Sequence, residues 1–254
     1  MADPSVVQAK SVLGSGSTIS LTLAAAPTNG NTVYVIIGGE ASDFSPNSAG
    51  SYSTLFETDQ SGFNTLRVGV FYIVASSMSA TVTFNTTSGV DCSMTVIEVA
   101  NAGTATAGTG QAQDFDSTPT VLGQTTGAAN ALHVGSCFSA ISDSGTNSAP
   151  AGYTGADILA ATNVVVAYKT IASPGATGDQ TFSCSEMAGG TSYTRGFVIE
   201  PTGGGGGGQP TQKRAGGVPW MGQHGAGFPS AIQRWIRRES GLQVPAYYRE
   251  RRAA

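Results

Sequence analysis

Few side chains of this sequence belong to types that perform chemistry, and their spacing matches no catalytic signature. The 254 residues include only two histidines, His133 and His224, and three cysteines. No Gly-x-Ser-x-Gly nucleophile elbow, phosphate-binding loop or His-Glu-x-x-His zinc helix occurs. A glycan-processing enzyme needs paired carboxylates in a groove, and Glu98 with Glu186 is the pair to examine. We therefore expect a protein that is not an enzyme and that holds no cofactor.

The remaining reactive side chains have simpler structural interpretations. Cys92, Cys137 and Cys184 lie in or beside expected strands without the spacing of a metal site, so we expect buried, reduced thiols. His133 falls within an expected strand and is interpreted as a half-buried structural residue. Three aspartates have oxygens suited to calcium, but we interpret them as solvated loop acids and expect no metal site: Asp114, Asp116 and Asp157.

Charge is divided unevenly along the chain. Residues 1–201 hold four bases and fourteen acids, whereas residues 202–254 hold eight bases and two acids. The resulting charges of −10 and +6 account for the net −4. Six consecutive glycines, Gly203 to Gly208, lie between the two parts and have the composition of a flexible linker. We predict three parts: a β-sandwich body over 1–201, a Gly-rich hinge over 202–212 and a basic, aromatic docking arm over 213–254.

The body has the sequence pattern of an all-β protein. Segments of alternating apolar and polar residues, rich in Val, Ile, Thr, Tyr and Phe, recur between turns of Gly, Asn, Ser and Pro. Short strands without interleaved helices predict an antiparallel β-sandwich or jelly roll of about ten strands. The expected strands span roughly 5–13, 18–23, 32–38, 64–75, 80–85, 92–99, 118–122, 131–140, 163–171, 179–184 and 195–200.

An internal repeat divides the body into two similar halves. The sequence NTVYV beginning at Asn31 aligns with NALHV beginning at Asn130, an offset of 99 residues. The Val-Ile-Glu that ends at Glu98 matches the one that ends at Glu200, an offset of 102 residues. We predict a duplicated five-strand unit whose copies pair face to face around one core, with both glutamates as structural residues at strand ends. Two small domains separated by the polar segment 101–117 are the alternative.

The basic arm has the features of a docking segment. Ser230 and Gly241 are suited to the two ends of a short helix. Apolar residues would share one face of that helix and arginines the other. Aromatic and arginine side chains are enriched at protein interfaces, and here Gly and Pro interrupt them as in an extended arm. We predict that the partner-docking residues are Val218, Trp220, Met221, Phe228, Ile232, Arg234, Trp235, Ile236, Arg237, Arg238, Tyr247 and Tyr248.

Three other interpretations of the arm remain open. Arginine and aromatic side chains also bind nucleic acid through phosphate contacts and base stacking. An anionic membrane is a second candidate, although one short helix with three apolar anchors binds weakly. A solvated or self-docked tail is the third. Because the anchors are spaced along the arm, a protein surface fits better than nucleic acid, and we expect no membrane partner. We also expect no membrane span and no signal peptide.

Several of these motifs resemble structural proteins of tailed bacteriophages. The resemblance rests on PTNGNTVYV from Pro27, on the segments beginning at Tyr72 and Thr81, and on strands that end in Val-Ile-Glu. The sequence GGVPWM from Gly216 is similar to the C-terminal ends of phage and prophage virion proteins. The resemblance covers most of the body and part of the arm. It implies a jelly-roll-like subunit of a virion: a capsid decoration or cement protein, a head fibre or a minor tail component.

The same resemblance implies partners and a location. The partners would be the major capsid protein or other virion subunits, with a homo-oligomer on the particle, and the chain would be made in the cytoplasm of a host bacterium. The alternative is a carbohydrate-binding or host-attachment module of a tail or head fibre. Its sugar-stacking residues would come from aromatic side chains near loops: Tyr52, Phe56, Phe63, Phe115, Tyr153 and Tyr193.

Overall fold

The computed structural model describes most of the body and none of the arm. The described residues are 2–40, 44–47, 50–60, 66–86, 91–114, 118–143, 146–159, 162–184 and 191–203. The chain divides between Gly208 and Gln209 into two units. The predicted docking residues and the helix expected after Ser230 lie outside the described residues. Thr202 donates from its backbone N–H and its hydroxyl to the Asn101 carbonyl at 3.2 and 3.0 Å, so the described body includes Thr202.

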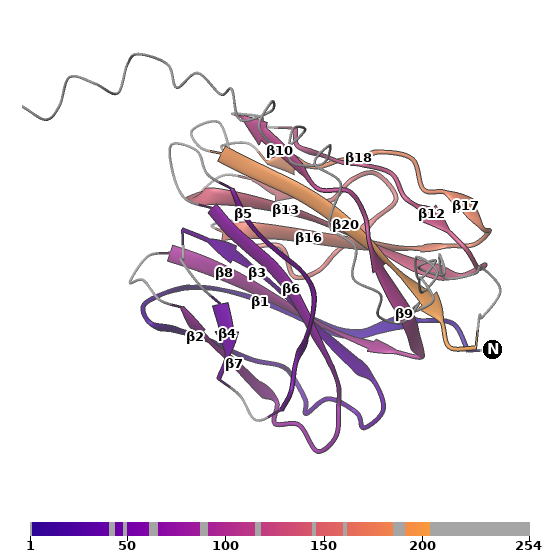
Figure 1. The fold of residues 1–254 in the computed structure, drawn as a ribbon, viewed down its shortest axis with the longest axis horizontal. Coiled ribbons are helices and arrows are strands. Elements are labelled where there is room, and N and C mark those ends of the chain that lie inside the picture. The colour runs from indigo at the N-terminus through magenta and orange to yellow at the C-terminus, as the bar shows by residue number, and fades with distance from the viewer. Residues whose placement is uncertain are drawn as a thin grey trace, which may run out of the picture. The chain divides into compact units, whose positions relative to one another are not determined.

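The first half of the body forms two antiparallel sheets (Figure 1). Its strands are β1 (Ser5–Ser15), β2 (Thr18–Thr22), β3 (Thr32–Gly39), β4 (Phe44–Pro46), β5 (Ser53–Gln60), β6 (Leu66–Val74), β7 (Thr81–Thr86) and β8 (Asp91–Ala100). The larger sheet has the order β1-β8-β3-β6-β5, and the smaller has the order β2-β7-β4. The strand pairs within both sheets are antiparallel.

The second half repeats this arrangement with shorter covering strands. Its longer strands are β9 (Ala102–Ala107), β10 (Gln111–Asp114), β13 (Ala131–Asp143), β16 (Thr162–Ile171) and β20 (Thr191–Pro201). They form the order β10-β20-β13-β16-β15, and β9 also pairs with β20. Of the short strands, β15 lies at the edge of this sheet beside β16. The other six form three separate covering pairs, β11-β18, β12-β17 and β14-β19. They are β11 (Thr120–Val121), β12 (Thr125–Thr126), β14 (Asn147–Ser148), β15 (Thr154–Gly155), β17 (Gly175–Ala176), β18 (Gln180–Thr181) and β19 (Ser183–Cys184).

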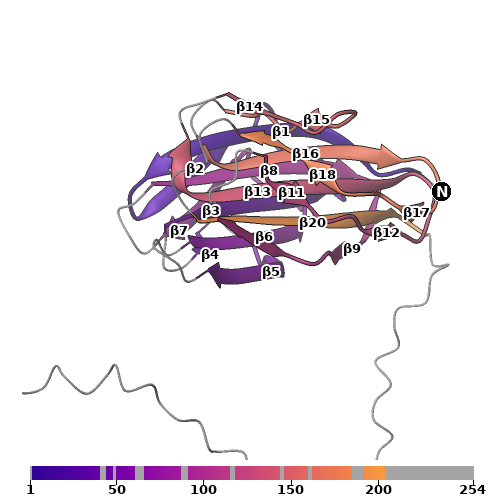
Figure 2. The ribbon, with the colours of Figure 1, turned by 90° about the horizontal axis from the view of Figure 1, so that it is seen from above.

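The two larger sheets lie one above the other in Figure 1 and overlap when seen from above in Figure 2, and they share a central core. Tyr34 of β3 and Phe197 of β20 meet there, with ring centroids 5.4 Å apart. Both halves supply the buried side chains of this core, which include Ile36, Phe56, Val68, Val70, Ile97, Leu132, Val134, Phe138, Val164, Val166 and Ile199. The all-β, antiparallel fold predicted from the sequence is therefore confirmed for the described residues. The halves share one core instead of forming separate small domains.

Each larger sheet also buries its second face, which gives four layers where a sandwich has two (Figure 1). In β3, Val33, Val35 and Ile37 face away from the central core and pack under the small sheet of the first half. In the second half, an outer core forms between the larger sheet and the short strands: Val121, Cys137, Val165, Ala167, Phe182 and Cys184. Burial on both faces explains why the apolar run of β3 is nearly continuous.

The polar segment 101–117 contains two strands that the sequence did not predict. Strands β9 and β10 pair with β20 as β1 pairs with β8, so this segment is the first strand of the second half. Its sequence is rich in Ala and Gly, which are depleted in strands, and its β-branched residues are all threonines. Pairing with a long neighbouring strand outweighs that weak local preference. Strands β4 and β5 were also missed.

The register of the repeat differs by one residue from the sequence alignment. The 99-residue offset equates Val33 with Leu132, yet Val33 pairs with Glu98 whereas Leu132 pairs with Ile199. Val33 faces an outer core and Leu132 faces the central core. A shift of one residue exchanges the two faces of a strand, so the central strands match at an even offset.

Candidate functional site

Glu98, at the end of β8, holds the loop that precedes β3. Its carboxylate accepts hydrogen bonds from the Thr28 backbone N–H at 2.8 Å and from the Asn31 and Gln8 side-chain amides, both at 2.6 Å. The side chain is only 1% exposed. Burial alone raises the pKa of Glu98, but the hydrogen bonds from Gln8, Asn31 and Thr28 outweigh it, and the net pKa is lowered. Glu98 is thus an ionised structural carboxylate at neutral pH.

Glu200 has the same role in the second half. Its two carboxylate oxygens accept the backbone N–H groups of Gly127 at 2.8 Å and Ala128 at 3.1 Å, in the loop that precedes β13. The matching Val-Ile-Glu sequences therefore place equivalent loop-holding carboxylates. Because Glu98 and Glu200 bind different loops, they do not form an acid–base pair. The other carboxylate considered with Glu98, Glu186, lies outside the described residues.

Replacing Glu98 with glutamine is expected to lower the free energy of unfolding by about 2 kcal/mol at pH 7. The new amide would place its own N–H donors against the donors of Gln8 or Asn31. Since the native pKa is lowered, the contribution of Glu98 is complete above the unfolded pKa of 4.5 and is lost as pH falls below it. Urea unfolding at pH 7 measures the loss. Asp91→Asn, at the exposed start of the same strand, is the control, and equal stability of both variants would contradict this role.

His133 is fully buried in β13, not half-buried as the sequence predicted. Its Nδ1 lies 2.9 Å from the Tyr153 hydroxyl, and its Nε2 lies 3.1 Å from the amide nitrogen of Gln124. An amide nitrogen only donates, so Nε2 is the acceptor and Nδ1 carries the proton. Burial lowers the pKa of His133 to about 4, so the imidazole is neutral at pH 7. His133 joins two covering segments and has no exposed face.

The three cysteines are free and buried, as predicted. Cys92 lies in the outer core of the first half, and Cys137 and Cys184 lie in that of the second half. Burial, followed by the charge of Asp91, raises the pKa of Cys92 to about 11. In the described part of the chain, no three His, Cys, Asp or Glu residues are grouped as a metal site would require.

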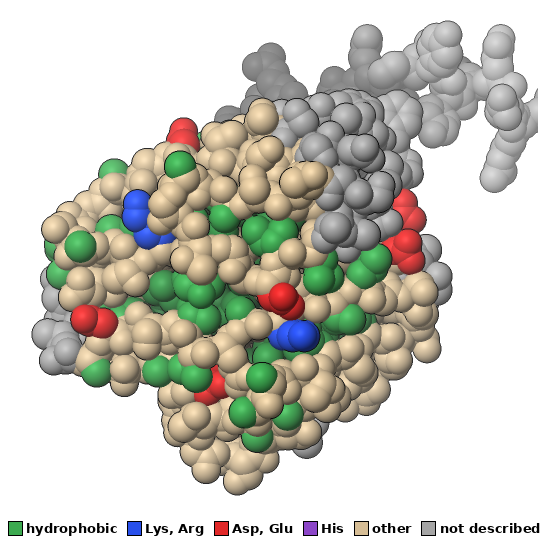
Figure 3. Space-filling view, turned by 180° about the vertical axis from the view of Figure 1, so that it is seen from behind, with side chains coloured by type: hydrophobic (Ala, Val, Ile, Leu, Met, Phe, Trp, Pro, Cys, Tyr) green, Lys and Arg blue, Asp and Glu red, His purple; other side chains and the backbone are tan. Residues whose placement is uncertain are grey.

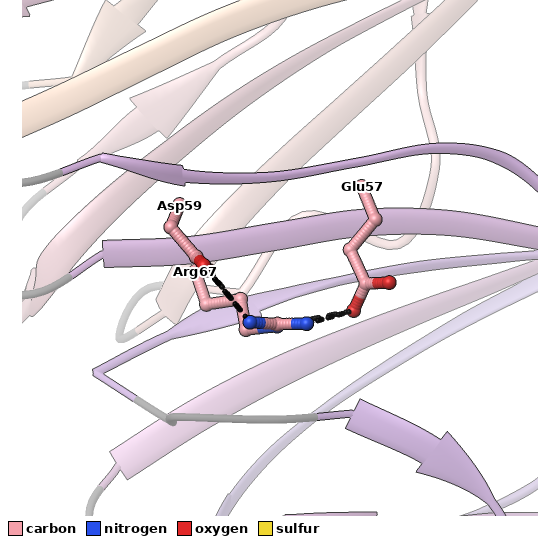
Figure 4. A network of polar contacts seen from close by, with 3 residues as sticks. All are labelled: Glu57, Asp59 and Arg67. Atoms are coloured by element: carbon pink, nitrogen blue, oxygen red, sulfur yellow. Dashed lines mark hydrogen bonds and ion pairs between the residues drawn. The ribbon is translucent and has the colours of Figure 1, made fainter.

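Ionic and polar contacts hold edges of the body in place. Arg67 of β6 reaches Glu57 and Asp59 of the edge strand β5, with nitrogen–oxygen distances of 3.0 and 2.8 Å (Figure 4). Asp157, one of the calcium candidates, accepts the backbone N–H of Ser11 in β1 at 2.8 Å. This contact links the two halves beside the edge strand β1 and gives Asp157 a structural role.

Most of the described aromatic residues that were considered for sugar binding pack within the body. Phe56 and Tyr193 are each 6% exposed and belong to the central core. The Arg195 guanidinium lies over the Phe56 ring at 4.3 Å and donates to the Gly108 carbonyl at 2.8 Å. Tyr52 packs edge-on against Phe84. The Asp114 side chain and residues Asp116, Phe63 and Phe115 lie outside the part of the chain whose side chains are described.

The described surface carries scattered charges and one notable cavity. Figure 3 shows one face of the body, on which backbone and uncharged polar side chains predominate, apolar side chains gather toward the middle and charged side chains are few. A cavity of about 320 Å³ lies beside the turn between β6 and β7. Its lining has no charged residue: Gly50, Ile73, Val74, Ser76, Ser77, Met78, Ser79 and Thr81.

Among the described residues, the groups able to perform chemistry hold loops, edges and covering segments and do not converge on a substrate-sized site. That part of the chain also contains no helix long and apolar enough to cross a membrane. The predicted docking residues, from Val218 to Tyr248, are not among those described. No protein-family model, curated protein or solved structure matches this chain.

Proposed function

We propose that this protein is a non-enzymatic structural component of a tailed-phage particle, namely a capsid decoration protein whose C-terminal arm docks on the shell. One observation carries the proposal: the sequence is partitioned at the six glycines into an acidic β body and a basic arm with both tryptophans. Glu98, Glu200 and His133 of the described body are engaged in holding its own loops. We therefore assign attachment to the arm, which carries the excess of bases and both tryptophans.

We further infer that each half of the body is a jelly roll. In a jelly roll, strands alternate between two sheets, so the first strand pairs with the eighth, the third with the sixth and eighth, and the second with the seventh. The strand orders β1-β8-β3-β6 and β2-β7-β4 support this topology, from which β5 departs by pairing with β6 in the larger sheet. The order β20-β13-β16, flanked by β9 and β10, supports it for the second half. Jelly rolls are common in viral capsids, which favours the virion proposal by analogy of fold.

The arm is suited to reach beyond its own subunit. Forty extended residues span about 130 Å. Its net charge of +6 favours a partner surface that carries carboxylates, either the shell subunit or a neighbouring copy of the acidic body. Tryptophan and arginine are the residues that dominate binding energy at protein interfaces. We therefore propose Trp220 and Trp235 as the principal anchors and the major capsid protein as the partner.

Counting this chain in purified particles tests the proposed function. Quantitative mass spectrometry should find hundreds of copies per particle, in a simple ratio to the major capsid protein. About a dozen copies would contradict a decoration protein and favour a head fibre or tail component. No copies in particles, together with glycan binding by the isolated protein, would replace the proposal with the carbohydrate-binding alternative. Burial of Phe56 and Tyr193 speaks against that alternative.

A further inference from the structure

His133 connects two covering segments, which also meet where Tyr153 packs in the outer core and hydrogen-bonds with Gln180. Gln124 comes from the link between β11 and β12, and Tyr153 comes from the turn before β15. Gln124 is tied to the neighbouring turn through Thr177, whose backbone N–H donates to the Gln124 carbonyl at 2.7 Å. The Thr177 hydroxyl accepts the Gln124 N–H at 2.9 Å. One imidazole therefore hydrogen-bonds to both sides of the outer layer.

In the described part of the first half, no polar side chain of β3 takes the place of His133. On the matching face of β3, the side chains packed under the small sheet are Val33, Val35 and Ile37. On β13, the same face presents His133 and Cys137. The covering strands of the second half have two residues each, whereas β2 has five and β7 has six. The short strands of the second outer layer therefore make fewer strand-pairing hydrogen bonds than those of the first. The side-chain contacts of His133 accordingly contribute a larger share of what holds that layer in place.

We propose that His133 is an acid-sensitive latch whose protonation opens the outer layer of the second half while the first half stays closed. A protonated imidazole donates from both nitrogens. Its Nε2–H would then face the N–H donors of the Gln124 amide, whose nitrogen lies 3.1 Å away, and the hydrogen bond between them would be lost. Lys169 is the cross-strand partner of His133 on β16, and like charges directly opposite each other destabilise a sheet. Burial of the new charge and the donor–donor contact with Gln124 therefore both oppose protonation of His133.

The other titratable groups around His133 do not relieve this charge. Tyr153 accepts from Nδ1, and the Lys169 ammonium lies 5.5 Å from its ring. On β20, the neighbours are Val198 and, farther along the same face, Glu200, whose oxygens are occupied by Gly127 and Ala128. The remaining titratable groups of this layer are Asp179, which accepts the Gly123 N–H, and Cys137 and Cys184.

The lowered pKa of His133 sets the pH window. The pKa is about 4 in the closed layer, against 6.5 for an exposed imidazole. Between these values the open layer binds one proton more, so closure is favoured as pH rises and weakened as pH falls. Above pH 6.5 the contribution of His133 is complete. Each pH step of one between these values favours opening about tenfold, and the effect levels off at about 300-fold below pH 4.

The three cysteines report this opening in the intact chain. Cys137 and Cys184 belong to the outer core of the second half, and Cys92 belongs to that of the first half. Labelling with 4,4′-dithiodipyridine, which works in acid, followed by mass spectrometry gives three rates in one sample. At pH 7 all three should be slow. Between pH 6.5 and pH 4.5 the Cys184 rate should rise about 40-fold relative to the Cys92 rate.

Two controls keep the latch proposal falsifiable. His133→Gln keeps a polar side chain without a titratable group, so the ratio of labelling rates should no longer depend on pH. In the His224→Gln chain, where His133 is the one histidine left, the imidazole NMR signal should titrate with a midpoint below pH 5. A constant ratio in the native chain, an equal rise at all three cysteines, an acid response retained by His133→Gln, or a midpoint near 6.5 would each overturn the proposal.

Discussion

Replacing Phe197 with alanine is expected to lower the free energy of unfolding by about 3–5 kcal/mol, the largest loss among single substitutions considered for the body. Phe197 is fully buried in β20 and its ring lies 5.4 Å from that of Tyr34. Tyr34 belongs to the other half, so the substitution leaves a cavity in the core that both halves share. Removing the ring should therefore weaken both halves together.

Urea unfolding followed by circular dichroism should show this as one shifted transition. The two outer cores, around Cys92 and Cys184, should become accessible to a thiol reagent at the same urea concentration. Val74→Ala is the matched control, because Val74 is 58% exposed at the end of β6 and its truncation should change stability by less than about 0.5 kcal/mol. Two transitions, of which only the second-half one shifts, would show that the halves do not depend on a common core.

The repeat and most strands could be predicted from the sequence because the long strands carry strong local patterns. The run from Thr32 to Gly39 is apolar enough to be read as a strand by itself. The sequence could not reveal that each larger sheet is covered on both faces, because the covering strands of the second half are only two residues long. Segments of that length have no detectable period, so the four-layer arrangement becomes visible only in three dimensions.

The roles of individual polar residues were harder to predict. Glu98 and Glu200 were expected to be structural, and their shared function of holding a loop follows from the repeat. The burial of His133 depends on Gln124 and Tyr153, which lie 9 and 20 residues away and approach it only in the folded sheet. Phe56 was read as a loop residue because β5 was not predicted, yet it packs in the central core. The arm remains a prediction from the sequence.

Removing the arm is expected to abolish attachment to the particle without unfolding the body. The chain should end at Gly203, because Thr202 still bonds to Asn101 and Pro201 pairs with Ala102. Such a chain retains the described β structure and the body's net charge of −10. It loses both tryptophans and eight of the twelve bases. Circular dichroism of the shortened chain should match an all-β protein without helix.

Single substitutions in the arm should separate its anchors from its charges. Trp235→Ala should weaken attachment about 30-fold or more, which corresponds to about 2 kcal/mol for a buried aromatic anchor. Arg252→Ala, near the chain end, should weaken it less, as expected for a charge at a solvated rim. If binding instead disappears with modest added salt and any polyanion competes, the arm binds nucleic acid.

Co-sedimentation with particles that lack this protein tests the central claim most directly. The full-length chain should bind saturably, and the chain ending at Gly203 should remain in the supernatant at the same concentrations. Equal sedimentation of both chains would contradict the account, because attachment would then reside in the acidic body and not in the basic arm.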